Sequence, residues 1–119
     1  GDFGGGIGFA DSIAGFKPLV GVYGNCDGQD IRRAYPSFQE MQEQGLKILM
    51  THIGGSPGHY DLRAQALIES YHPDIFVLYI NPGASGFQGW HLERTALRFK
   101  IEQGQIKDME LFRLPRKVY

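Results

Sequence analysis

The feature that most constrains this chain is a pattern of short apolar runs, each followed at once by a polar loop that contains glycine. Three runs show it, and they lead into the sequences GNCD, THIGG and NPGASG. Short apolar runs bounded by turn residues are typical of buried strands. We therefore expect strands at Leu19–Tyr23, Lys47–Thr51 and Asp74–Asn81, and we expect Leu19–Tyr23, Lys47–Thr51 and Asp74–Val77 to be neighbours in one sheet.

The segments between these runs indicate a mixed α/β fold. Helical spacing of apolar residues predicts helices, and the step from His72 to Pro73 ends the second of them. Alternation and turn residues predict further strands, with Gly104 in the turn of a late hairpin. The expected elements are helices at Phe9–Phe16 and Tyr60–Tyr71, an edge strand or hairpin approach at Phe38–Gly45, loop and turn at Asp27–Tyr35, and hairpin strands at Ala96–Glu102 and Ile106–Leu111.

Length and composition indicate one ordinary globular domain. The chain has 119 residues, of which 42% are hydrophobic, and its net charge is −1. This balance implies no general attraction to nucleic acid or to an anionic membrane. A single cysteine excludes an internal disulfide and favours a cytoplasmic protein. No apolar run approaches the length of a membrane span, so no membrane association is expected.

Side chains that can bind metal lie in or beside glycine-containing turns. Asp2, Asn25 and His52 offer a carboxylate, an amide oxygen and an imidazole, which together suit Mn²⁺, Fe²⁺ or Zn²⁺. In open α/β sheets, ligands bind outside the carboxyl ends of the strands. We therefore expect Asn25, His52 and Asn81 to meet at one rim of the sheet, and Asp2 to join Asn25 and His52.

Other interpretations of the same residues stay open at this point. Asn25 and Asp27 could form an Asx-turn after the strand. His52 could be a metal ligand, an acid or base, or a core residue. Cys26 could be a nucleophile beside His52, or a small buried residue. The sequence GGGIG at Gly4–Gly8 is not a phosphate-binding loop, because it has neither the Lys-Ser/Thr ending nor the G-x-G-x-x-G spacing.

Taken in order, GD, GNCD, THIGG and INPGAS resemble motifs of the calcineurin-like metallophosphoesterase superfamily. The chain is most similar to its small bacterial and archaeal phosphodiesterase branch, which is also similar to the retromer scaffold subunit of eukaryotes. The resemblance extends from Gly1 to about Phe112. It implies a two-sheet α/β/β/α sandwich with helices outside.

The resemblance also implies roles for individual residues. Asp2 matches a carboxylate that bridges two metals, and Asn25 and His52 match ligands of the second metal. Cys26 stands where many members carry a histidine that assists the leaving group, so the catalytic set is expected to be Asn25, Cys26 and His52. Asp27 matches an acid that supports this site. Asn81 and Gly83 match a loop that lines the site.

The implied function is that of a metal-dependent phosphodiesterase or phosphatase. Two divalent ions, with Mn²⁺ favoured over Fe, Zn, Ni or Mg, would activate a hydroxide for in-line attack on a small-molecule phosphate ester. The alternative is a metal-free interaction scaffold, similar to the retromer subunit. A third interpretation is a metal-binding regulatory domain without turnover. The physiological substrate and the oligomeric state, including a homo-oligomer, stay open.

Two family motifs are absent from the sequence. The family carries D-x-H ahead of GD, and G-H-x-H between the strands that match DIFV and LYINPG. We expect a single domain at 1–119 in which the first strand and one metal-binding loop are not represented. On this interpretation, Val77 and Leu78 are not adjacent in the complete protein. A natural chain that had lost these ligands would be poor in metal and inactive.

Overall fold

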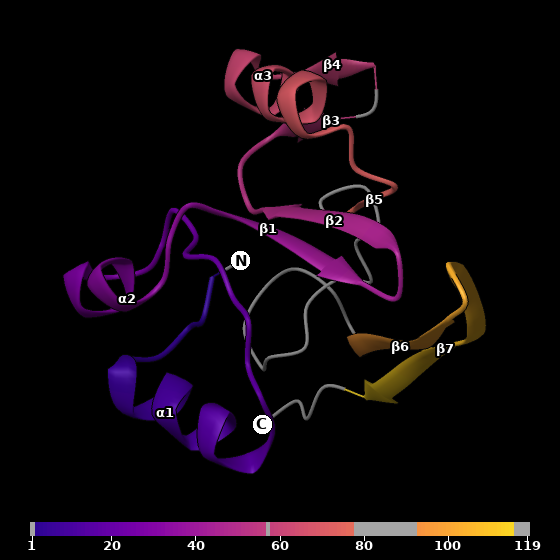
Figure 1. The fold of residues 1–119 in the computed structure, drawn as a ribbon. Helices are drawn as coiled ribbons and strands as arrows, with labels where there is room; N and C mark the ends of the chain where they lie inside the picture. Colours follow the sequence, from indigo (N-terminus) through magenta and orange to yellow (C-terminus); the bar gives the residue numbers. More distant parts are fainter. Residues whose placement is uncertain (1, 57, 78–92, 116–119) are drawn as a thin grey trace.

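The computed structural model describes residues 2–56, 58–77 and 93–115 of the chain (Figure 1). In these ranges the chain folds into helices and strands in a mixed order. The elements are α1 (Ile7–Phe16), α2 (Gln29–Ala34), β1 (Phe38–Glu43), β2 (Leu46–Thr51), β3 (Gly55–Ser56), β4 (His59–Tyr60), α3 (Leu62–Tyr71), β5 (Ile75–Phe76), β6 (Glu93–Glu102) and β7 (Gln105–Pro115).

Strand β2 is the centre of a three-stranded sheet with the order β1-β2-β5. It pairs antiparallel with β1 and parallel with β5. Ile48 and Leu49 of β2 are buried, as its apolar sequence predicts. A two-residue turn joins β1 to β2, and Gln44 and Gly45 both have positive φ, as a type I′ turn requires. The strand expected at Lys47–Thr51 and the edge strand expected at Phe38–Gly45 are therefore confirmed.

The strand expected at Leu19–Tyr23 is wrong. Val22 is fully buried, as expected, but the segment pairs with none of the strands in the described ranges. Its backbone groups find other partners: the Tyr23 N–H donates to the Pro36 carbonyl, and the Gly21 carbonyl accepts from the Gln39 side chain. The segment is therefore buried, and its backbone bonds to a loop and to a side chain. An apolar run predicted its burial correctly but did not predict its hydrogen-bond partners.

Helix α2 lies where loop and turn were expected, at Asp27–Tyr35. Its six residues are too few to show a helical period in the sequence. The segment nevertheless carries suitable charges, with Asp30 in the first turn and Arg32 and Arg33 in the last. Ile31 is fully buried and anchors the helix. The loop interpretation of this segment is therefore corrected to a short helix.

The two predicted longer helices are confirmed, with shifted starts. Helix α1 begins at Ile7, two residues before the expected Phe9. Helix α3 begins after Asp61, whose side chain accepts a hydrogen bond from the Ala64 N–H at 2.8 Å and so caps the helix. It ends at Tyr71, and the following His72 adopts the left-handed conformation ahead of Pro73. None of the helices within the described ranges is long and apolar enough to cross a membrane.

The late hairpin is confirmed and is longer than expected. Strands β6 and β7 pair antiparallel along most of their length, with an irregularity between Arg98 and Lys100. Gln103 and Gly104 form the turn, again with positive φ at both positions. Every residue of β7 is exposed. The hairpin is therefore well paired on both sides of this irregularity, but it contributes no buried residue.

The α/β class is confirmed, whereas the two-sheet sandwich stays a prediction. The described strands form the three-stranded sheet, the short β3–β4 hairpin and the separate β6–β7 hairpin. Strand β5 is parallel to β2, as expected, but is described only at Ile75–Phe76. Of the predicted strand Asp74–Asn81, Asp74 lies in a bend and Val77 in a turn, whereas residues 78–81, the junction after Val77 and the loop with Gly83 lie outside the described residues.

The apolar core lies between α1 and β5 in the sequence. Figure 1 shows α3 above the sheet, α2 to the left of the sheet, and α1 below the sheet and to its left. The buried residues come from these helices, the sheet and the segment before α2. The buried hydrophobic residues are Ala10, Val22, Ile31, Ile48, Leu49, Ala64 and Ile75. This core fixes the ends of the segments that carry the candidate site.

Candidate metal centre

The structure brings Asp2, Asn25 and His52 together from three separate segments. His52 Nε2 lies 2.9 Å from Asn25 Oδ1 and 3.5 Å from Asp2 Oδ2. Asn25 follows the buried segment at Val22, and His52 follows the last residue of β2. The expected meeting of these three side chains is therefore confirmed, and their metal-binding roles stay a prediction.

The two oxygens of Asp2 have different partners. Oδ1 accepts a hydrogen bond from the Cys26 backbone N–H at 2.9 Å, and Oδ2 faces His52. The close approach of Asp2 depends on Gly24, because a Cβ atom at position 24 would overlap the Asp2 carboxylate. The GD and GNCD sequences therefore fit together only with glycine at position 24.

Asp27 is buried and ties two of the three segments together. Its Oδ1 accepts from the Phe3 N–H at 2.9 Å, and its Oδ2 accepts from the Gly24 N–H at 2.8 Å. The Gly24 bond runs to backbone three residues earlier, whereas an Asx-turn bonds two residues onward, so these two bonds do not form the Asx-turn alternative. Asn25 instead directs its side-chain oxygen to His52. Asp27 acts on the centre by holding the segment of chain that follows Asp2.

Cys26 is exposed, so its interpretation as a small buried residue is wrong. The adjacent Asn25 side-chain amide lies 3.6 Å from its Sγ. The exposed position follows from the turn at Gly24–Asp27, which leaves the second central residue at the surface. A catalytic role for Cys26 stays a prediction.

His52 is half-buried, with 30% of its side chain exposed. The preceding Thr51 is buried, and its hydroxyl lies 3.1 Å from the Ile53 carbonyl, which fixes the chain around His52. Its Nε2 faces two oxygen atoms, Asn25 Oδ1 and Asp2 Oδ2. The core interpretation of His52 is therefore wrong, and its ring nitrogen is available to a ligand.

The spacing of these donor atoms fits a divalent ion. Two ligands with bonds of about 2.1 Å lie roughly 3.0 Å apart at a right angle and roughly 3.4 Å apart at a tetrahedral angle. The separations of 2.9 Å and 3.5 Å fall close to these values. His52 would bind a cation through Nε2 in the neutral tautomer that carries its proton on Nδ1, and the Asp2 and Asn25 oxygens would be the other donors. The donor set of carboxylate, amide and imidazole suits Mn²⁺, Fe²⁺ or Zn²⁺.

The number of ligands limits what the centre can hold. Within the described ranges, no group of three or more His, Cys, Asp and Glu side chains gathers as a metal site. The centre has one carboxylate and one imidazole, with the Asn25 amide as its third donor. These residues suit one ion, and a second ion would need further ligands.

Sequence reasoning missed Arg32, which contacts the loop of the centre. Its Nη2 donates to the Asn25 carbonyl at 3.0 Å, and its Nε donates to the Asp27 carbonyl at 2.9 Å. The loop expected at Asp27–Tyr35 hid the helix that presents it. Predicting α2 from its terminal charges would have placed Arg32 one turn from the loop.

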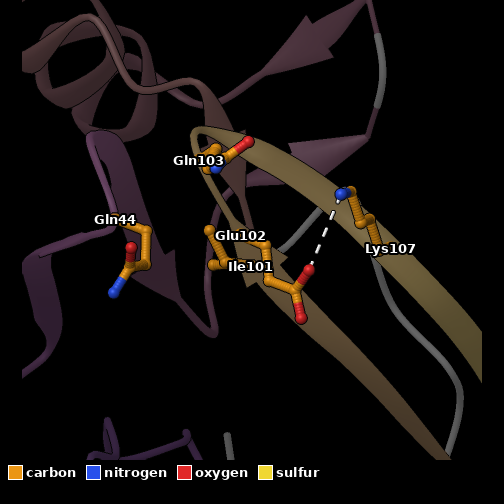
Figure 2. Close-up of a pocket in the computed structure, with 5 residues that line it drawn as sticks. All are labelled: Gln44, Ile101, Glu102, Gln103 and Lys107. Atoms are coloured by element: carbon orange, nitrogen blue, oxygen red, sulfur yellow. Dashed lines mark ion pairs between the residues drawn. The ribbon is translucent and has the colours of Figure 1, made fainter.

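A shallow pocket of about 360 Å³ lies elsewhere, at the tips of two hairpins. Figure 2 shows its lining residues, with the ion pair between Lys107 and Glu102 at 3.6 Å. The lining comes from the β1–β2 turn and the β6–β7 hairpin, and no residue of the candidate centre belongs to it. The lining residues are Gln44, Ile101, Glu102, Gln103 and Lys107.

Comparison with known proteins identifies one family. A family model described as "Calcineurin-like phosphoesterase superfamily domain" matches residues 1–77. No curated protein and no solved structure matches the chain. The matched residues include Asp2, Asn25 and His52, and the match ends at Val77, before the β6–β7 hairpin.

Proposed function

Because the chain belongs to the calcineurin-like phosphoesterase superfamily, we propose that it is a phosphodiesterase that uses Asp2, Asn25 and His52 to bind metal. The family indicates a metal-dependent hydrolase of phosphate esters in general. We infer two divalent ions, with Mn²⁺ preferred, of which Asp2, Asn25 and His52 suit one and the second needs further ligands, and a small-molecule phosphodiester as substrate. A cytoplasmic location is part of this proposal, since an exposed free thiol at Cys26 suits a reducing compartment.

The observation that supports the proposal is the meeting of three donor atoms from distant segments. Asn25 and His52 are separated by 27 residues, yet their side chains lie 2.9 Å apart. Asp2 reaches the same place from the start of the chain. Such convergence at the surface contributes little to packing, because Asp2 and Asn25 are exposed. A ligand is the simplest reason to hold these groups together.

Each residue has a defined task in this proposal. Divalent ions, when bound, supply charge neutralisation at the phosphoryl oxygens and lower the pKa of water. His52 and Asp2 provide nitrogen and oxygen donors, and the Cys26 N–H holds Asp2 in place. Asn25 contributes an oxygen donor without negative charge, so the centre keeps more positive charge for a phosphate anion than a set of carboxylates would.

The test is hydrolysis of bis-p-nitrophenyl phosphate with and without added Mn²⁺. We expect Mn²⁺-dependent turnover, and we expect His52→Ala to lower kcat/KM by roughly 100-fold because it removes a metal ligand. His59→Ala is the matched control, since His59 is exposed on β4. Unchanged Mn²⁺-dependent turnover in His52→Ala would refute the proposed role of this residue.

A metal-free interaction scaffold is the second candidate, and the small number of ligands favours it. The described residues gather no cluster of three His, Cys, Asp or Glu side chains. Calorimetric titration with Mn²⁺ separates the two functions. Heat of binding that disappears in His52→Ala supports the phosphodiesterase, whereas a flat titration of the wild-type chain supports the scaffold.

A further inference from the structure

We propose that Arg32 is a positioning residue of the metal centre, which fixes the peptide unit between Asn25 and Cys26. This inference rests on the proposed function, because it assigns Arg32 a task in the same centre. Arg32 lies on α2 and its guanidinium contacts the loop from outside. It acts through the loop and touches neither Asp2 nor His52 in any contact that the described residues show.

One planar peptide unit links Arg32 to Asp2. The Asn25 carbonyl accepts from Arg32 Nη2 at 3.0 Å. The N–H of the same unit belongs to Cys26 and donates to Asp2 Oδ1 at 2.9 Å. Because a peptide unit is planar and trans, its carbonyl and its N–H point in opposite directions. Holding the carbonyl with Arg32 therefore aims the N–H at Asp2.

This orientation decides which oxygen of Asp2 stays available. With Oδ1 bound by the Cys26 N–H, Oδ2 faces His52 Nε2 at 3.5 Å. If the peptide unit rotated, Asp2 would lose its hydrogen bond to the Cys26 N–H, and its carboxylate would be free to turn. The Asn25 side chain begins at the same unit, so its approach to His52 would loosen as well.

The guanidinium of Arg32 is itself held in place. Its Nε donates to the Asp27 carbonyl at 2.9 Å, so the group spans two carbonyls of one loop. It also lies over the Tyr23 ring, 4.9 Å from the ring centre. The preceding Ile31 is fully buried and fixes α2. A planar group with two donors in fixed geometry suits this task, and a lysine ammonium does not reproduce it.

The experiment compares Arg32→Gln, Arg32→Lys and Arg33→Gln. Arg33 is the matched control, because it is the exposed neighbour on α2. Mn²⁺ affinity is measured by calorimetry, Mn²⁺ coordination by electron paramagnetic resonance, and folding by thermal unfolding. We expect Arg32→Gln to weaken Mn²⁺ binding about 10-fold to 100-fold, as for other groups that orient metal ligands. Arg32→Lys should bind with intermediate affinity, and Arg33→Gln should bind within about twofold of wild type.

Kinetics separate positioning from substrate binding. If Arg32 acts only through the metal ligands, the variants need more Mn²⁺ for half-maximal activity, while KM for bis-p-nitrophenyl phosphate stays unchanged. A raised KM at saturating Mn²⁺ would mean that Arg32 contacts the ester, and it would overturn the positioning role.

The remaining outcomes also decide the inference. Wild-type Mn²⁺ affinity in folded Arg32→Gln overturns it. If Arg32→Gln does not fold, Arg32→Lys decides: weakened Mn²⁺ binding supports the inference, and wild-type binding overturns it. If the unmodified chain binds no Mn²⁺ and hydrolyses no ester, the proposed function fails, and this inference fails with it.

Discussion

The region at residues 2–77 and the β6–β7 hairpin are built on different principles. Among the residues that the structure describes, the seven buried hydrophobic ones lie in the first region, between Ala10 and Ile75. The hairpin at Glu93–Pro115 has none, and every residue of β7 is exposed. The family match ends at Val77 and so separates the same two regions. Core and candidate centre therefore belong together, and the hairpin stands apart from both.

Their polar contacts differ in the same way. In the first region, hydrogen bonds join segments far apart in sequence, such as Asp27 with Phe3 and His52 with Asn25. In the hairpin, the ladder is joined by exposed ion pairs between facing strands, such as Arg98 with Glu110. Distant bonds can assemble a site from separate segments, whereas local ones support only their own hairpin. The following substitutions test this contrast.

The largest expected effect is on the core. Leu49→Ala should lower the free energy of unfolding by about 2–5 kcal/mol, because Leu49 is fully buried in β2. Leu111→Ala in β7 should cost about 1 kcal/mol or less, because that side chain is 46% exposed. Urea denaturation measures both. Equal losses for the two variants would show that the hairpin packs against a core that the described residues do not reveal.

A smaller effect is expected at the junction of Asp2 with Gly24. Gly24→Ala should destabilise the chain by about 1–3 kcal/mol and weaken Mn²⁺ binding, because the new Cβ overlaps Asp2. Gly8→Ala in α1 is the control: a Cβ there meets no atom within 4 Å, and alanine favours the helix by about 0.5–1 kcal/mol. Denaturation and Mn²⁺ calorimetry on both variants give the answer. A Gly24→Ala chain with normal Mn²⁺ affinity would contradict the close fit.

The hairpin ion pairs should contribute little. A double-mutant cycle of Arg98→Ala and Glu110→Ala should give a coupling of about 0.2–1 kcal/mol that falls with added salt, since both side chains are exposed. Neither variant should change Mn²⁺ affinity. A coupling well above this range, or altered metal binding, would contradict the contrast between the two regions, because it would show that the hairpin is more than a separate, locally bonded unit.

The smallest expected effect concerns one hydrogen bond between α2 and the first residue of α1. Asp30 accepts a hydrogen bond from the Ile7 N–H at 2.8 Å, and this bond lowers the pKa of Asp30. A lowered folded pKa stabilises the contact above the unfolded value of about 3.9, and the contact is lost as the pH falls through the folded value. An acid titration of the Ile7 amide by NMR should show this transition. The transition should be absent in Asp30→Asn, and its persistence there would assign it to another acid.

The sequence predicted those parts of the fold that carry a local signal. Periodicity placed α1 and α3, and the positions of Gly104 and of the Lys47–Thr51 run placed the late hairpin and the central strand. It failed where tertiary contacts decide. Leu19–Tyr23 has the composition of a strand, but its backbone bonds to Pro36 and Gln39 rather than to a ladder.

The candidate site was predictable for a different reason. Asp2, Asn25 and His52 each stand in a recognisable family motif, so the order of the motifs along the chain was enough to expect their meeting. Arg32 belongs to no motif, and its bonds to the loop depend on a helix of six residues. The role of Arg32 is therefore visible only in the structure, where its two bonds to the loop are formed.

The Gln-Gly turns of the two main hairpins have a consequence for the order of folding. Gln44–Gly45 and Gln103–Gly104 join strands that are adjacent in sequence, and such hairpins form in about 1–10 μs. The centre must close loops of 24 and 27 residues, between Asp2 and Cys26 and between Asn25 and His52. Closing loops of this length costs more chain entropy than joining strands that are adjacent in sequence. Metal binding therefore becomes available late in folding, and a refolding chain would capture Mn²⁺ more slowly than it forms its hairpins.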